Sequence, residues 1–166
     1  MNTDAELQRL ATKIGAHLLD AERRVVTAES CSGGWIGKAM TDVPGSSAWY
    51  LGGVISYSNT LKQSILGVLP STLAQHGAVS EAAAHEMAIG ALETFGGHIA
   101  IAVTGIAGPD GGQSGKPVGT VWFAWAWHDG DEIETRTALE TFSGDREAVR
   151  RQTVARALGE ILTLNV

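Results

Sequence analysis

Small polar and ionisable residues follow three apolar runs of this sequence, at the points where strands would end. The three groups are Glu29, Ser30 and Ser32, then Tyr57 and Lys62, and then Thr104 and Gly105. In a sheet whose neighbouring strands run parallel, such ends lie side by side at one edge. The sequence therefore predicts a single site at that edge.

A serine and a lysine in such a site could attack a carbonyl group. Serine needs a base at neutral pH, and because no histidine is well placed, Lys62 is the candidate base for Ser30. Burial would have to lower the pKa of Lys62 well below its ordinary value. The ordinary alternative makes Lys62 a solvated helix residue, Tyr57 a packing residue and Ser30 a helix cap. The residues alone leave both interpretations open.

Cys31 is a rival nucleophile, because a helix N-terminus lowers the pKa of a thiol. Its alternative role is that of a small buried packing residue.

Spacing excludes several familiar sites. Asp110 stands where a Walker A loop needs its first glycine, and Pro117 stands where that loop needs its hydroxyl. His85-Glu86 lacks a second histidine at position 89, which is Ile89, so a zincin helix is excluded. We expect no metal site and no cofactor.

Composition describes one globular domain spanning residues 1–166. Apolar residues make up 44% of the 166 residues, charged residues 18%, and the net charge is −6. An acidic chain has no general attraction for nucleic acid or anionic membranes. The apolar runs are strand-sized, the N-terminus is polar, and a single cysteine forms no internal disulfide. We therefore expect a soluble cytoplasmic protein.

The apolar periodicity predicts alternating helices and strands. Helices are expected over residues 3–20, 32–40, 70–76, 80–95 and 145–162, with a further short helix that begins at 58–59 and contains Lys62. Strands are expected over residues 25–28, 50–57, 99–104, 120–127 and 132–139. The last two strands flank a turn and predict an antiparallel hairpin. This pattern predicts a three-layer α/β/α sandwich with a mixed, mainly parallel sheet of about five strands.

Two sequence features predict local structure near the site. Gly52-Gly53 within the second strand indicates a bulge or a close backbone approach. Arg146 lies in the first turn of the last helix, where a cation opposes the helix dipole unless an anion is nearby. Arg146 is therefore a candidate phosphate contact. Ser46 and Ser47 are further candidates.

Five ordered motifs together resemble the CinA C-terminal domain family over nearly the whole chain. They are residues 28–34 (AESCSGG), 53–59 (GVISYSN) with Lys62, 77–80 (GAVS), 104–112 (TGIAGPDGG) and 116–120 (KPVGT). The family more usually has threonine at the position of Ser32, which keeps the hydroxyl. Longer members carry an N-terminal molybdopterin-binding-like domain that is not expected here.

The resemblance implies hydrolysis of the carboxamide of nicotinamide mononucleotide to nicotinic acid mononucleotide and ammonia. It implies Ser30 as nucleophile, Lys62 as its base and Tyr57 as a hydrogen-bonding partner of that dyad. The expected partner is a small nucleotide, held by Glu29, Ser32, Gly33, Gly34, Ser46, Ser47, Asn59, Thr104, Gly105 and Arg146. Backbone N–H groups near Ser32, Gly33 and Gly34 are expected to hold the oxyanion.

Two further interpretations stay open. The same loops could grip a nucleotide without catalysis, as a binding or sensor module. Trp49, Trp122, Trp125 and Trp127 supply large apolar faces, for which core packing is the default and a homodimer face the alternative.

Overall fold

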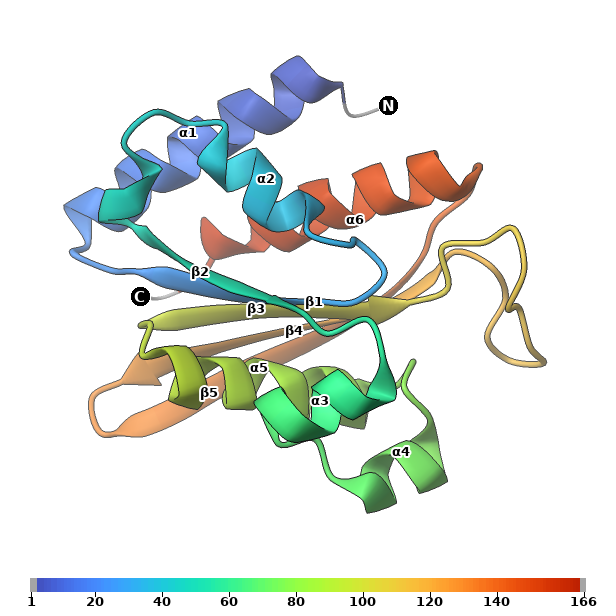
Figure 1. The fold of residues 1–166 in the computed structure, drawn as a ribbon. Coiled ribbons are helices and arrows are strands. Elements are labelled where there is room, and N and C mark those ends of the chain that lie inside the picture. The colour runs from blue at the N-terminus through green and yellow to red at the C-terminus, as the bar shows by residue number, and fades with distance from the viewer. Residues whose placement is uncertain (1–2, 165–166) are drawn as a thin grey trace.

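Helices cover both faces of one five-stranded sheet (Figure 1). The computed structural model describes residues 3–164. The strands are β1 (Val25–Glu29), β2 (Tyr50–Ile55), β3 (Ile99–Gly105), β4 (Thr120–Asp129) and β5 (Glu132–Thr141). Their order across the sheet is β2-β1-β3-β4-β5.

The helices form two layers around this sheet. They are α1 (Asp4–Asp20), α2 (Trp35–Thr41), α3 (Asn59–Leu66), α4 (Pro70–His76), α5 (Glu81–Phe95) and α6 (Arg146–Ile161), with a short 3₁₀ helix η1 (Ser46–Ala48). Helices α1, α2 and α6 lie on one face, and α3, α4 and α5 lie on the other (Figure 1). The predicted three-layer α/β/α architecture is confirmed.

The strand directions bring three carboxyl ends together. Strand β1 pairs in parallel with both β2 and β3, whereas β4 and β5 are antiparallel additions. The segments that follow β1, β2 and β3 therefore leave the sheet at the same end, as the three polar groups of the sequence require.

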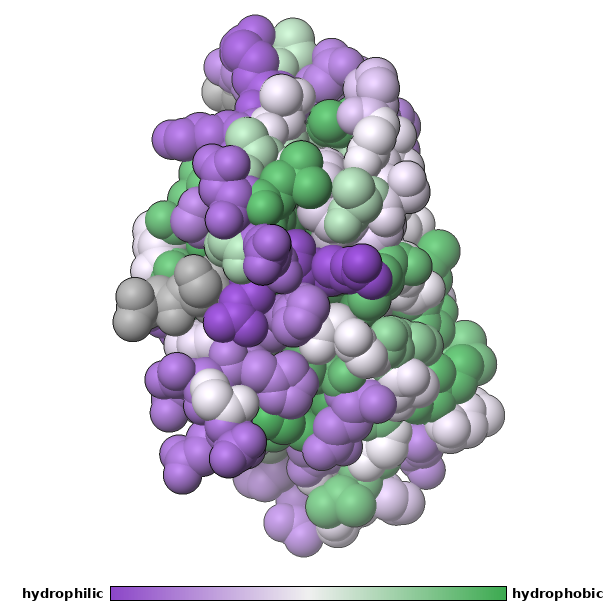
Figure 2. All heavy atoms as spheres, turned by 90° about the vertical axis from the view of Figure 1, so that its left-hand side faces the viewer, coloured by the Kyte–Doolittle hydropathy of each residue, from purple (hydrophilic) through white to green (hydrophobic). Residues whose placement is uncertain are grey.

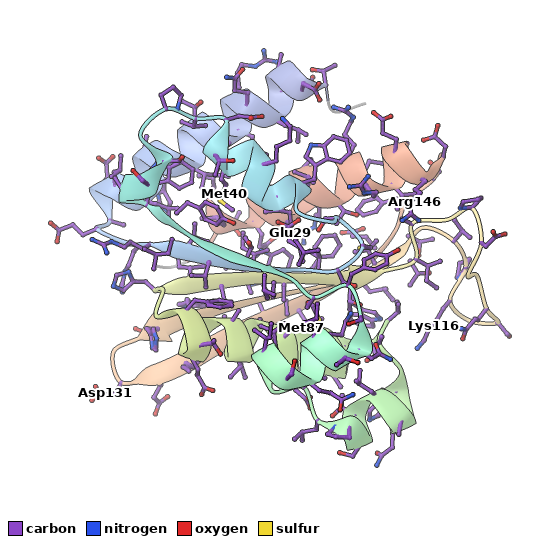
Figure 3. All side chains as sticks on the ribbon, in the orientation of Figure 1. Glu29, Met40, Met87, Lys116, Asp131 and Arg146 are labelled. Carbon is purple, nitrogen blue, oxygen red and sulfur yellow. The ribbon has the colours of Figure 1, made fainter. Side chains whose placement is uncertain are left out.

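Each face of the sheet has its own hydrophobic core. Met40 packs in the core under α1, α2 and α6, and Met87 in the core formed with α5, so the two methionines lie on opposite sides of the sheet (Figure 3). Trp49, Trp125 and Trp127 are buried in the first core, and the Trp125 indole donates to the Ala157 carbonyl at 3.0 Å. These three tryptophans are core residues and do not form a dimer face. Self-association itself stays a prediction.

Local capping explains where most helices begin. Thr3 and Glu6 form the expected capping box of α1, and Ser58, Ser80 and Asp145 cap α3, α5 and α6. The predicted start of the second helix is wrong, because α2 begins at Trp35 and not at Ser32. Residues 31–34 form turns instead, and the Ser32 hydroxyl is engaged by Glu29 rather than by helix amides.

At Gly52-Gly53 the structure has both of the features that the sequence offered as alternatives, a bulge and a close backbone approach. The β1–β2 register shifts between Val25 and Val26, and Gly52 has a φ of 123°. A Cβ at Gly53 would lie 2.1 Å from Thr27 Oγ1, so only glycine allows this close approach of β2 to β1.

The surface carries both hydrophilic and apolar side chains on the end away from the carboxyl ends of β1, β2 and β3 (Figure 2). None of the helices within residues 3–164 combines the length and apolar character needed to cross a membrane.

We predict that Gly90→Ala destabilises the protein while Gly159→Ala does not. A Cβ at Gly90 on α5 would lie 1.8 Å from the Leu66 carbonyl oxygen at the end of α3, whereas a Cβ at Gly159 on α6 meets nothing within 4 Å. Such overpacking lowers the free energy of unfolding by about 1–3 kcal/mol, and Gly→Ala in an open helix raises it by up to about 1 kcal/mol. Denaturant unfolding of both variants checks this; equal shifts would contradict the close α3–α5 contact.

Candidate active site

A cavity of about 330 Å³ opens at the carboxyl ends of the three parallel strands. Predicted site residues from all three groups line it: Ser30, Tyr57, Asn59, Lys62, Thr104, Gly105 and Arg146. Cys31, Ala78, Val79 and part of the glycine-rich loop after β3 complete the wall. The structure thus brings the residues after β1, β2 and β3 into one polar cavity.

Ser30 and Lys62 meet at the base of this cavity. Lys62 Nζ lies 3.0 Å from Ser30 Oγ and donates to the Ser56 carbonyl at 2.7 Å. Lys62 is 1% exposed and Ser30 is 7% exposed. Burial lowers the pKa of Lys62 because desolvation penalises the ammonium form. A lowered pKa increases the fraction of neutral amine, and a neutral amine can accept the proton of the serine hydroxyl.

Local structure fixes where the Lys62 amine lies. Ser58 caps α3 by accepting from the Leu61 N–H at 3.2 Å, which starts the helix directly after β2. Lys62 therefore sits in the first turn of α3, where the positive end of the helix dipole also disfavours a cation.

Ser30 is held by its backbone at the end of β1. Its N–H donates to the Val103 carbonyl at 3.0 Å, which extends the β1–β3 pairing by one residue. Its carbonyl accepts from the Gly33 N–H at 3.1 Å, which closes a turn just beyond the nucleophile candidate.

Glu29 binds the start of α2 and does not line the cavity. One carboxylate oxygen accepts from the Ser32 hydroxyl at 2.7 Å and from the N–H groups of Gly34 and Ile36 at 3.0 Å. The other accepts from the Gly37 N–H at 2.8 Å. Glu29 is buried between the sheet and α2 (Figure 3). The structure thus gives Glu29 and the Ser32 hydroxyl a role in the architecture rather than in substrate contact.

Two of the N–H groups that were expected to hold an oxyanion already make hydrogen bonds within the protein. The Gly33 N–H donates to Ser30 and the Gly34 N–H donates to Glu29. Both glycines have positive φ, 63° and 91°, which lets the chain fold back over Glu29. Neither Gly33 nor Gly34 lines the cavity.

Cys31 lies beside Ser30 but is a poor nucleophile. Burial raises the pKa of the Cys31 thiol to about 12, so the thiolate is scarce at neutral pH. The structure therefore favours the packing role for Cys31 over the catalytic one.

Tyr57 and Arg146 form the rim of the cavity. The Arg146 guanidinium donates to the Gly108 carbonyl at 2.7 Å and to the Tyr57 hydroxyl at 3.3 Å. Arg146 lies at the start of α6, next to the loop that follows β3 (Figure 3). Within residues 3–164 the Tyr57 side chain makes no hydrogen bond to Ser30 or Lys62, so the expected bond to the dyad is not seen here.

Ser46 and Ser47 lie away from this cavity. They belong to η1, which precedes the amino end of β2, whereas the cavity lies beyond its carboxyl end. The six residues of β2 span roughly 20 Å. The structure does not bring these serines together with the other predicted site residues.

Thr104 and Gly105, the predicted site residues at the end of β3, both line the cavity. The Thr104 hydroxyl donates to the Ala78 carbonyl at 2.7 Å, which ties the segment before α5 to the cavity wall. A Cβ at Gly105 would lie 2.7 Å from the Thr120 carbonyl oxygen, so glycine is required where β3 and β4 meet. Asn59 lines the cavity from the first residue of α3.

The ionisable side chains that line the cavity, besides Cys31 and Tyr57, are Lys62, Asp110 and Arg146. Among residues 3–164, His, Cys, Asp and Glu side chains do not gather in groups of three or more that could hold a metal ion. The cavity thus offers a buried amine at its base, with a carboxylate and a guanidinium around it.

Two contacts of this region have no counterpart in the sequence analysis. The Ser56 carbonyl accepts from Lys62, and Arg150 on α6 donates to the Ser32 carbonyl at 2.7 Å. Ser56 ends the second apolar run, so its position near the site was open to sequence reasoning. Arg150 lies 118 positions from Ser32 and had no local signal.

Comparisons with known proteins identify the family of this chain. The CinA C-terminal domain model matches residues 7–164. The nicotinamide-nucleotide amidohydrolase PncC of Escherichia coli K12 is 54% identical over 94% of this chain and 93% of its own length. The protein of the same name from Pseudomonas putida is 50% identical over 93% of this chain and 94% of its own.

A solved structure has the same fold. The competence damage-inducible protein A (ComA) of Klebsiella pneumoniae superposes with a TM-score of 0.90 at 40% identity, covering 96% of this chain and 99% of its own. Since the family model covers residues 7–164 and these relatives match over more than nine tenths of both chains, this chain belongs to the CinA C-terminal domain family.

Proposed function

We propose that this protein hydrolyses the carboxamide of nicotinamide mononucleotide, with Ser30 as nucleophile and Lys62 as base. The observation that carries the proposal is the 3.0 Å approach of a buried lysine amine to a serine hydroxyl at the base of a polar cavity. The names of the relatives from Escherichia coli and Pseudomonas putida support the substrate.

The first half of the reaction makes an acyl-enzyme. The neutral amine donates one N–H to the Ser56 carbonyl, which leaves its lone pair free for the Ser30 hydroxyl proton. Ser30 Oγ bonds to the carboxamide carbon, and the C=O π electrons move onto oxygen. Lys62 then gives its proton to the departing nitrogen, the electron pair on the oxyanion re-forms the C=O bond, and the C–N bond breaks so that ammonia leaves.

Water completes the cycle. With ammonia gone, Lys62 takes a proton from a water molecule that attacks the nicotinoyl ester carbon. The ester C–O bond breaks, Lys62 returns the proton to Ser30 Oγ, and nicotinic acid mononucleotide leaves. The same amine therefore serves both halves.

The charges at the rim fit the proposed substrate. Nicotinamide mononucleotide combines a cationic pyridinium ring with an anionic phosphate. Asp110 can attract the ring, Tyr57 offers an aromatic face to a cation, and Arg146 can pair with the phosphate. Free nicotinamide is neutral and would use none of these charges.

The setting proposed is the cytoplasm, with a free nucleotide as partner. The net charge of −6 is unfavourable for binding nucleic acid. The cysteine is a buried free thiol, which agrees with a reducing compartment.

We predict that Ser30→Ala and Lys62→Met abolish ammonia release from nicotinamide mononucleotide, while Cys31→Ala retains it. The first two remove the nucleophile and the base, and the third removes only a protonated thiol. Ammonia release and thermal unfolding with and without nucleotide are measured together. Nucleotide that stabilises the wild type without ammonia release would indicate a binding module instead. Loss of activity in Cys31→Ala, with Ser30→Ala active, would identify a cysteine amidase.

The depressed pKa of Lys62 predicts a pH-dependent contribution to stability. Between the folded-state pKa and the ordinary lysine value near 10.5, the unfolded chain holds a proton that the native state has lost. The wild-type free energy of unfolding should therefore gain from Lys62 as pH rises through this range. Lys62→Met should lack that gain. Denaturant unfolding across this pH range tests it, and parallel profiles for the two proteins would contradict a depressed pKa.

Arg146→Ala should impair binding of nicotinamide mononucleotide more than binding of nicotinamide riboside, which lacks the phosphate. Loss of a charge-assisted contact predicts a rise in KM of about 10- to 100-fold for the mononucleotide. KM for the riboside should change little. Steady-state kinetics with both substrates checks this. Equal changes in KM would show that Arg146 does not bind the phosphate.

A further inference from the structure

The turn after Ser30 leaves two backbone N–H groups without an acceptor. Of the five N–H groups from Ser30 to Gly34, three are engaged: Ser30 donates to Val103, Gly33 to Ser30 and Gly34 to Glu29. Within residues 3–164 no other residue accepts from the N–H groups of Cys31 and Ser32. Both belong to the turn that begins at the nucleophile candidate, and of the two only Cys31 lines the cavity, since Ser32 is buried.

Glu29 holds this turn from the side of α2. Its carboxylate accepts from the Ser32 hydroxyl and from the N–H groups of Gly34, Ile36 and Gly37, at 2.7 to 3.0 Å. Since Glu29 directly precedes Ser30, these bonds tie both ends of the turn to one buried group.

Arg150 holds the same turn from α6. Its guanidinium donates to the Ser32 carbonyl at 2.7 Å and lies 5.3 Å from the centre of the Trp35 ring. A Cβ at Gly33 would lie 3.2 Å from the same guanidinium nitrogen. In the part of the chain that the structure describes, no carboxylate pairs with Arg150, whereas Arg151 pairs with Asp4 and Glu147. The hydrogen bond of Arg150 therefore goes to the turn.

Resting on the proposed function, we propose that the Cys31 N–H is a donor of the oxyanion hole and that Arg150 is the residue that positions the turn carrying it. When Ser30 Oγ bonds to the carboxamide carbon, the negative charge forms on the carbonyl oxygen. An N–H group already held beside Ser30 can stabilise that oxygen without reorganising. Arg150 acts through the Ser32 carbonyl, and its unpaired positive charge favours an anion at the turn.

The neighbouring arginine provides a matched control. Arg151 also lies on α6 and over the Trp35 ring, at 4.8 Å, but has no hydrogen bond to the turn. Arg150→Ala should lower kcat for nicotinamide mononucleotide by about 10- to 100-fold, because displaced donors bind the transition state poorly, with KM nearly unchanged. Arg151→Ala should lose its ion pairs and leave kcat within about twofold.

Chemical rescue separates positioning from folding. Guanidinium ion at low millimolar concentration should restore part of kcat in Arg150→Ala and none in Lys62→Met, with thermal unfolding recorded for every variant. An unchanged kcat in Arg150→Ala, or a fall matched by Arg151→Ala without rescue, overturns the assignment while the proposed function stands. Absence of ammonia release by the wild type overturns the proposed function and this assignment with it.

Discussion

A lysine amine buried without a carboxylate partner is the constraint on which the site depends. Lys62 is 1% exposed, and among the described residues 3–164 its amine bonds only to a hydroxyl and a backbone carbonyl. Burying an ammonium ion without a counter-charge costs several kcal/mol, so the neutral amine is favoured. A salt bridge at this position would stabilise the cation and remove the base.

Glu29 shows how the fold manages a carboxylate beside the nucleophile. The residue directly precedes Ser30, yet its charge is compensated by the amides at the start of α2 and by the dipole of that helix. Satisfied in this way, Glu29 needs no cation, and the amine of Lys62 needs no anion. The two groups stay separate in charge although they lie on either side of the same serine. Because the amides at the start of α2 bind Glu29, its carboxylate does not pair with Lys62 and does not stabilise the charged form of the base.

Much of this arrangement could be predicted from the sequence because the rules involved are local. Caps at Thr3, Ser58 and Ser80 mark helix starts, the turn between β4 and β5 marks a hairpin, and apolar periodicity gives the remaining elements. Parallel pairing then places Ser30 and Lys62 at one edge, since residues that follow neighbouring parallel strands must emerge together.

The errors arise where tertiary contacts override local signals. Ser32 has the side chain of a helix cap, but Glu29 captures it, and α2 starts three residues later. Ser46 and Ser47 precede β2 rather than follow it, so topology removes them from the site. Arg150 reaches the nucleophile turn from 118 residues away. Because α6 follows every strand along the chain and supplies both Arg146 and Arg150, the geometry of the rim and of the turn depends on long-range packing that local sequence signals do not report.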